Sequence, residues 1–180
     1  MGKAPPAPAI FVVYVILGSL ASFCGGRTPG ELPTMKEMAF PTAVLCGFAV
    51  LYSLLDVMGV GIAKQRTGMN DMPYKERKAD FKVPELVYLA ERAQMNQVEQ
   101  FTSFIIATLS FAFFVNGRLA GFLASIYTIL RFLYTSTYRK GVGKDFEHMG
   151  LIKFTVPCYF ILNGMACGTV VQALRLLAFY

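Results

Sequence analysis

Three polar side chains lie at helical spacing just before the sequence becomes strongly apolar. Arg92, Asn96 and Glu99 occupy positions i, i+4 and i+7, so a helix places them on one stripe. The segment that follows, 101–114, contains only apolar and small hydroxyl residues and is typical of a membrane helix. A cation, an amide and a carboxylate are costly in hydrocarbon, so the stripe predicts either a ligand site or an ion-paired contact between helices.

A second polar stripe with the same spacing follows in the next apolar segment. Arg131, Thr135 and Tyr138 again lie at i, i+4 and i+7, and Tyr134 adjoins them. The dipeptide Asn-Gly at 116–117 predicts a very short turn between the two helices. Helices joined by so short a turn must be antiparallel neighbours, which brings the two stripes to one place.

The depths of the two stripes predict how they meet. At a rise of about 1.5 Å per residue, Arg131 is expected to reach toward Glu99 or Asn96, and Tyr138 toward Arg92. Two arginines beside one deep carboxylate leave spare positive charge, which favours a pocket for a small anionic ligand. The alternative is a closed ion-pair network that only fixes helix packing.

The elements that carry these stripes are predicted to be membrane helices. The chain has 180 residues, of which 55% are hydrophobic and 16% charged, a composition too apolar for a soluble domain of this size. We predict an all-α integral membrane four-helix bundle at 40–180, preceded by an N-terminal segment and linker at 1–39. The four spans are predicted at 40–63, 85–114, 118–138 and 150–177, and a shorter apolar segment at 9–24 is expected to form a fifth, short or tilted membrane helix.

The net charge of +6 comes largely from loops on one side of the predicted bundle. Because basic loops stay on the side of synthesis, we expect that side to face the cytosol, or the matrix or stroma of an organelle, from an endoplasmic reticulum or organelle membrane. Nucleic-acid binding is not predicted, since no basic helix with interleaved aromatics lies outside the spans. The basic residues of that side are Lys64, Arg66, Lys75, Arg77, Lys78, Lys82, Arg139, Lys140 and Lys144, against Arg27, Lys36, Arg118 and Arg175 on the other.

Few other side chains in the spans could do chemistry. Asp56 lies inside the first span, where it is expected either to pair with an arginine of a neighbouring helix or subunit or to be protonated. The single histidine, His148, lies in a loop and no C-x-x-C pair occurs, so no metal site is predicted. Four cysteines in apolar segments are expected to be buried free thiols: Cys24, Cys46, Cys158 and Cys167.

The two stripes resemble sequence motifs of the MAPEG family, the membrane-associated proteins of eicosanoid and glutathione metabolism. Residues 92–99, RAQMNQVE, match the family's second-helix pattern Arg-Ala-x-x-Asn-x-x-Glu at each specified position. Residues 131–138, RFLYTSTY, are similar to the third-helix pattern Arg-x-x-His-Thr-x-x-Tyr, with Tyr134 in place of the histidine. The resemblance covers about residues 40–178.

This resemblance implies a glutathione site. Family protomers usually assemble as homotrimers in the lipid bilayer, with glutathione bound between subunits near the cytosolic face and a lipophilic small molecule entering from the lipid. Glutathione carries two carboxylates and one ammonium, so arginines can clamp the acids while Glu99 takes the amine. Carried over position by position, the residues expected to hold glutathione are Arg92, Asn96, Glu99, Arg131, Tyr134 and Tyr138.

One departure from the family pattern concerns catalysis. Catalytic members carry an arginine at the start of the fourth helix, where it stabilises the glutathione thiolate, and Met149 falls at that position here. Lys144, His148 and Lys153 are the candidate substitutes. Two functions therefore stay open: a glutathione transferase or peroxidase acting on lipophilic electrophiles or lipid hydroperoxides, or a catalytically degenerate scaffold or accessory subunit of a larger membrane complex.

Overall fold

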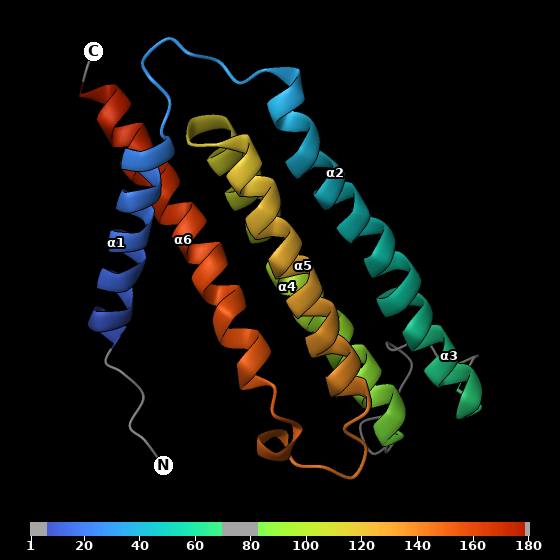
Figure 1. The fold of residues 1–180 in the computed structure, drawn as a ribbon. Helices are drawn as coiled ribbons and strands as arrows, with labels where there is room; N and C mark the ends of the chain where they lie inside the picture. Colours follow the sequence, from blue (N-terminus) through green and yellow to red (C-terminus); the bar gives the residue numbers. More distant parts are fainter. Residues whose placement is uncertain (1–6, 70–82, 179–180) are drawn as a thin grey trace.

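The computed structural model describes residues 7–69 and 83–178, and all regular secondary structure in these ranges is helical. Long helices run alternately up and down in a bundle, and the N-terminal helix crosses the last one (Figure 1). The predicted all-α bundle with an added N-terminal helix is confirmed. The elements are α1 (Ala7–Gly25), α2 (Met35–Leu51), the π-helical η1 (Tyr52–Val57), α3 (Met58–Arg66), α4 (Glu85–Phe114), α5 (Gly117–Arg139), the short 3-10 helix η3 (Phe146–Met149) and α6 (Ile152–Leu177).

The first long helix combines three elements, α2, η1 and α3, into one continuous run, Met35–Arg66. It starts earlier than the predicted 40–63 because a capping box begins it at Thr34, and it continues past the predicted end to Arg66. The Thr34 hydroxyl accepts from the Glu37 backbone N–H, and the Glu37 carboxylate accepts from the Thr34 N–H at 2.9 Å. In its middle, the wider π turn of η1 places Asp56 fully inside the protein.

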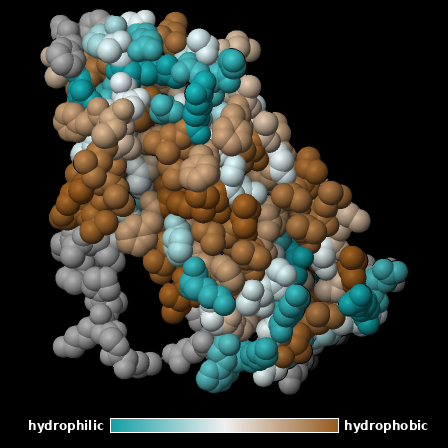
Figure 2. Space-filling view, viewed as in Figure 1, coloured by the Kyte–Doolittle hydropathy of each residue, from teal (hydrophilic) through white to brown (hydrophobic). Residues whose placement is uncertain are grey.

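Three described helices are long and apolar enough to cross a membrane: Met35–Arg66, Gly117–Arg139 and Ile152–Leu177. The remaining predicted span, α4, has 30 residues and is about 45 Å long; it is not one of these three, and charged and amide side chains are concentrated in its first half. Hydrophobic side chains cover the middle of the face shown in Figure 2, with hydrophilic ones toward its two ends. The chain is therefore a multi-pass membrane protein.

The basic loop residues gather at one end of the bundle. The end of α3, the start of α4 and the α5–α6 connection lie together at the bottom of Figure 1, as the predicted topology requires. The exposed side chains of Arg66, Lys140 and Lys144 are at this end. Four further basic residues counted in the prediction lie outside the described residues: Lys75, Arg77, Lys78 and Lys82.

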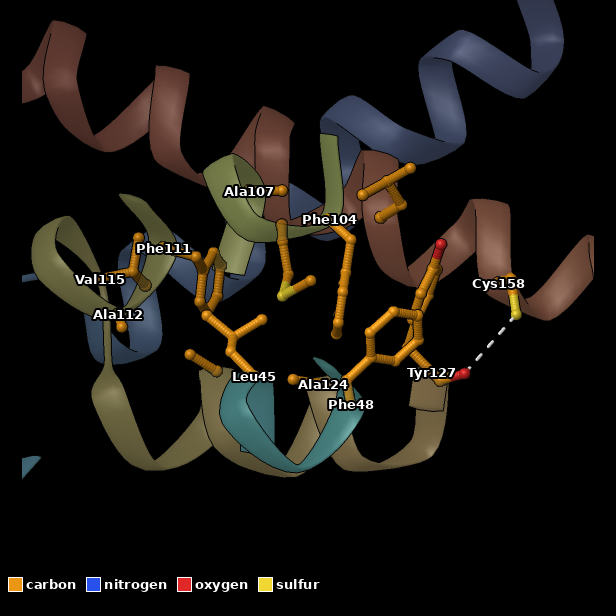
Figure 3. Packing of buried hydrophobic residues seen from close by; sticks show 13 residues of the cluster. Leu45, Phe48, Phe104, Ala107, Phe111, Ala112, Val115, Ala124, Tyr127 and Cys158 are labelled. Carbon is orange, nitrogen blue, oxygen red and sulfur yellow. Dashed lines mark hydrogen bonds between the residues drawn. The ribbon is translucent and has the colours of Figure 1, made fainter. Parts of the chain in front are cut away.

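Aromatic rings fill the centre of the bundle. Phe48 of α2 lies with its ring centroid 5.2 Å from that of Phe104 of α4, and the Phe104 ring stacks on Tyr127 of α5 at 4.1 Å (Figure 3). Alanines on α4 and α5, including Ala112 and Ala124, are fully buried and let these helices approach closely. This core holds α4 at a fixed rotation, which decides where its polar stripe points.

Close backbone contact holds the added helix α1 against α6. A Cβ at Gly18 would lie 2.5 Å from the backbone nitrogen of Gly168 and 2.8 Å from the carbonyl carbon of Cys167, so only glycine fits at this crossing. The Tyr14 ring meets the Phe160 ring edge-on, with centroids 5.2 Å apart. The short apolar helix predicted at 9–24 is thus a packed part of the bundle.

A buried polar network, which sequence reasoning missed, joins the same two helices about one turn beyond this crossing. The Ser22 hydroxyl donates to Gln172 Oε1 at 2.7 Å, and Gln172 Nε2 donates to the Arg27 carbonyl at 2.6 Å. Arg175 donates to the Ser22 carbonyl at 3.0 Å. The network ties the end of α1 to α6 and leaves Arg27 near Glu37, 3.4 Å away.

Replacing Gly18 by leucine is expected to separate α1 from α6, because the new side chain would occupy space held by the α6 backbone. Overpacking of this kind costs about 1–3 kcal/mol. Thermal unfolding in detergent, followed by circular dichroism, should show a lower midpoint. Gly47→Ala is the control, since no described atom lies within 4 Å of a Cβ there. Equal midpoints for the two variants would contradict the tight crossing.

The expectation of four buried thiols is wrong for two cysteines. Cys158 is buried and Cys167 partly so, but Cys24 and Cys46 are exposed on the protomer surface. The reason is physical: a membrane helix presents one apolar face to lipid, so an apolar sequence neighbourhood does not imply burial in protein.

Candidate functional site

The predicted α4 stripe lies on the outside of the protomer. The Arg92 and Glu99 side chains are exposed and Asn96 is half-buried. Within the described part of the chain, neither Arg92 nor Glu99 forms a hydrogen bond or an ion pair. The same face of α4 continues to Ser103 and Ser110. Its residues alternate in spacing between four and three positions, which is typical of a contact surface between two helices.

Arg131, by contrast, lies inside the protein. Its side chain is almost fully buried, and its Nε donates to Gln97 Oε1 at 2.7 Å. A terminal nitrogen donates to the Asn96 carbonyl, and the guanidinium carbon lies 5.1 Å from the centroid of the Tyr134 ring. The predicted contact of Arg131 with Asn96 is confirmed, through the backbone, whereas no contact with Glu99 forms in the described protomer. Arg131 thus anchors the α4 turn that carries the stripe.

The two tyrosines of the third-helix motif line the inner side of the same turn. Asn96 Nδ2 donates to the Tyr134 hydroxyl oxygen at 2.9 Å, and the Tyr134 and Tyr138 ring centroids are 5.8 Å apart. Tyr138 is buried against Leu89 rather than bonded to Arg92. The predicted Tyr138–Arg92 contact is therefore absent from the described protomer, because the two side chains lie on different faces of the helix pair.

Asp56 belongs to a buried ion pair. Its carboxylate accepts from Arg139 of α5 through one oxygen and from Gln97 Nε2 at 3.5 Å through the other. Arg139 fits because Gly59 faces it: a Cβ there would lie 2.5 Å from the guanidinium. The expected pairing of Asp56 with an arginine of a neighbouring helix is confirmed, with Arg139 as the partner.

Gln97 connects this ion pair to the stripe. It donates to Asp56 with its amide nitrogen and accepts from Arg131 with its amide oxygen, so three helices share one polar network. Sequence reasoning missed Gln97 and assigned Arg139 only to a basic loop. A signal was present, because Gln97 follows Asn96 directly and faces the buried side that Ala93 also occupies.

The start of α6 has no cation in the expected position. Met149 packs beside the cluster of Tyr134, Tyr138 and Leu151, with its sulfur against Gly141. The three candidate substitutes, Lys144, His148 and Lys153, are all exposed. The Lys153 ammonium lies 5.0 Å from the Phe154 ring centroid, and none of the three makes a described contact with the stripe.

A cavity of about 430 Å³ lies between α4 and α6, one turn beyond Glu99. Its wall combines apolar side chains with hydroxyl and amide groups, which is unusual for a surface that faces only lipid chains. Within 7–69 and 83–178, no cluster of three or more His, Cys, Asp or Glu side chains could hold a metal ion. The cavity residues are Ser103, Ile106, Ala107, Ser110, Leu162, Asn163, Ala166, Thr169 and Val170.

Fold and site together define a multi-pass helical membrane protein in which a polar stripe on α4 faces the outside of the protomer. The family model described as the MAPEG family matches residues 40–165, which is more than half of the chain. The chain belongs to the MAPEG family. No match was found among curated proteins or among solved structures. The matched range begins in α2 and ends in α6, so α1 precedes it.

Proposed function

We propose that this protein binds glutathione at the stripe of Arg92, Asn96 and Glu99 and uses it against lipophilic electrophiles or lipid hydroperoxides. One observation carries the proposal: Arg92 and Glu99 are exposed and unpaired in the described protomer, while the more buried charges of Asp56 and Arg139 are paired with each other. Charged groups beside hydrocarbon need a partner, and the described residues, 7–69 and 83–178, supply none to Arg92 or Glu99. A zwitterionic tripeptide with two carboxylates and an ammonium supplies charges of both signs.

The same exposure supports assembly with further copies of the chain. Residues 92, 96, 99, 103, 106 and 110 follow the alternating 4-3 spacing of a seam between helices. A second copy placed on this face would shield the stripe from lipid and enclose the tripeptide between subunits. We propose a homotrimer, as is usual in the family, and light scattering of the detergent-solubilised protein should give three chains per particle.

The cavity between α4 and α6 is proposed to receive the lipophilic substrate. It starts one turn from Glu99 and continues along the groove between α4 and α6, so a reactive group held at its near end would lie close to glutathione bound at the stripe. Its hydroxyl and amide groups, from residues such as Ser103 and Asn163, can donate hydrogen bonds to, or accept them from, oxygen-containing groups of a lipid substrate.

Met149 supports a second candidate function. It packs with Tyr134 and Tyr138 in the position where catalytic relatives carry the thiolate-stabilising arginine. A member that keeps the ligand residues without this cation would bind glutathione or a lipid as a scaffold, or as an accessory subunit of a larger membrane complex.

Binding and turnover measurements on the purified protein in lipid nanodiscs separate the two candidates. Equilibrium dialysis should show glutathione binding, and conjugation of a generic aryl halide should follow if the protein is a transferase. An isomeric tripeptide with an ordinary α-peptide bond in place of the γ-glutamyl bond is the matched control. Binding without conjugation of an aryl halide or reduction of a lipid hydroperoxide would favour the scaffold, and absence of binding would remove glutathione from the proposal.

A further inference from the structure

Tyr159 of α6 has an unusual hydrogen-bond arrangement beside the stripe. Its side chain is 40% exposed, and its hydroxyl oxygen accepts from Gln100 Nε2 at 2.7 Å. The amide of Gln100 is oriented by the buried Tyr127, whose hydroxyl donates to Gln100 Oε1 at 3.2 Å. The nitrogen of Gln100 therefore faces Tyr159.

This arrangement leaves the Tyr159 proton available. The oxygen is already an acceptor, and no described residue accepts a hydrogen bond from its O–H. A hydroxyl whose oxygen accepts one bond becomes a better donor for the next, because the two bonds polarise each other. Tyr134 is held in the same way by Asn96, but Tyr134 is only 6% exposed and cannot meet a ligand as readily.

Along the bundle, Tyr159 lies between the stripe on α4 and the cavity between α4 and α6. Its partner Gln100 follows Glu99 directly, and Leu162 and Asn163, about one turn further along α6, line the cavity. The hydroxyl is thus located between the charged stripe and the cavity. A thiol held by the stripe and aimed at a substrate in the cavity would pass next to it.

We infer that the Tyr159 hydroxyl donates a hydrogen bond to the glutathione thiolate, in place of the arginine that Met149 replaces; this inference rests on the proposed function. The bound thiol loses its proton to water, and Tyr159 keeps its own proton while hydrogen-bonding the sulfur. The sulfur lone pair then forms the bond to the electrophilic carbon, and the leaving group departs with its electron pair. Tyr159 would be a catalytic residue, since it touches the reacting sulfur.

Few charged or ionisable groups near Tyr159 could stabilise the thiolate in its place. On α4 the neighbouring acid is Glu99, next to Gln100. On α5 the ionisable neighbours are Tyr127, Tyr134 and Arg131, and Arg131 is already bonded to Gln97 and the Asn96 carbonyl. On α6 the adjoining residue is Cys158, which is buried, and the exposed Lys153 lies nearly two turns away toward the start of the helix.

The test is a pH titration of the thiolate absorbance of bound glutathione in the wild type and in Tyr159→Phe. Loss of a hydrogen bond to a charged sulfur should raise the apparent pKa of the bound thiol by about one unit, so that about tenfold less thiolate is present at neutral pH. The rate of aryl halide conjugation should fall in proportion and recover at higher pH. Glutathione affinity should change by less than about threefold, since the stripe is intact.

Two further variants make the outcome decisive. Gln100→Leu keeps the hydroxyl but removes the amide that polarises it, so it should shift the thiol pKa in the same direction by a smaller amount. Tyr88→Phe changes another exposed tyrosine, on α4, and should leave the titration unchanged. If the wild type binds no glutathione, the proposed function fails; if it binds glutathione and neither Tyr159→Phe nor Gln100→Leu moves the thiol pKa, the role of Tyr159 is overturned.

Discussion

Arg92→Ala and Glu99→Gln are each expected to weaken glutathione binding about 10- to 100-fold. Each change removes a charge-assisted hydrogen bond to the ligand, worth about 1.5–3 kcal/mol. Because both side chains are exposed and unpaired in the described protomer, neither change disrupts a contact among the described residues. Isothermal titration of the purified protein in detergent would measure the affinities.

The specificity of this effect can be tested with a matched arginine. Arg118 is exposed at the opposite end of the bundle, in the first turn of α5, and Arg118→Ala should leave glutathione affinity unchanged. The folded state should be unaffected in all three variants, as judged by the unfolding temperature. Wild-type affinity in both Arg92→Ala and Glu99→Gln would mean that the stripe is not the glutathione site.

The second large effect concerns stability. Asp56→Leu alone would leave Arg139 half-buried without its counter-ion, and Arg139→Met alone would leave Asp56 fully buried with only Gln97 as a partner. Removing one member of a buried ion pair costs about 3–5 kcal/mol, because the remaining charge is left uncompensated. Both single variants should therefore show much lower thermal unfolding midpoints in detergent.

The double variant Asp56→Leu/Arg139→Met should recover most of this loss. Replacement of both charges by apolar groups removes the desolvation cost together with the attraction, and such exchanges are often neutral. A double-mutant cycle measures the difference directly. If the double variant were as unstable as the sum of the two single ones, the two side chains would not be coupled, and the ion pair would have no part in holding η1 against α5.

Much of the helix arrangement could be predicted because it follows from spacing. The i, i+4, i+7 repeats predicted two polar faces, and the Asn-Gly turn at 116–117 made their helices neighbours, so the contact of Arg131 with the turn at Asn96 was predictable. The pairing of Asp56 with an arginine followed from the cost of an isolated charge in hydrocarbon.

The sequence could not predict which of the two stripes faces the interior of the protomer and which faces outward. Arg92 and Arg131 have the same place in their motifs, yet one is exposed and the other buried, because the rotation of α4 is set by packing of residues such as Phe104 and Ala112 in the core. A helical period identifies a face but not the direction in which tertiary packing turns it. For the same reason the exposure of Cys46 had no sequence signal.

The pairing of α1 with α6 could not be predicted from the sequence pattern. Gly18 and Gly168 are far apart in the sequence, and each belongs to a small-x-x-x-small motif, with Ser22 and Gly164 respectively, that identifies a packing face but not its partner. Glycines are frequent in membrane helices, so composition alone does not indicate which pair forms a contact. The Ser22–Gln172 bond near the same interface has no local signature either.

The π turn of η1 makes the first long helix sensitive to its exact length. A π turn holds an extra residue compared with an α-helical turn, and each residue of an α-helix turns the chain by about 100°. Deleting one residue within 52–57 would allow ordinary α-helical geometry and rotate everything on one side of the deletion relative to the other. Asp56 and Gly59 could then no longer both face Arg139. Substitutions in this segment leave the register intact, so we expect it to tolerate changes of side chain far better than insertions or deletions.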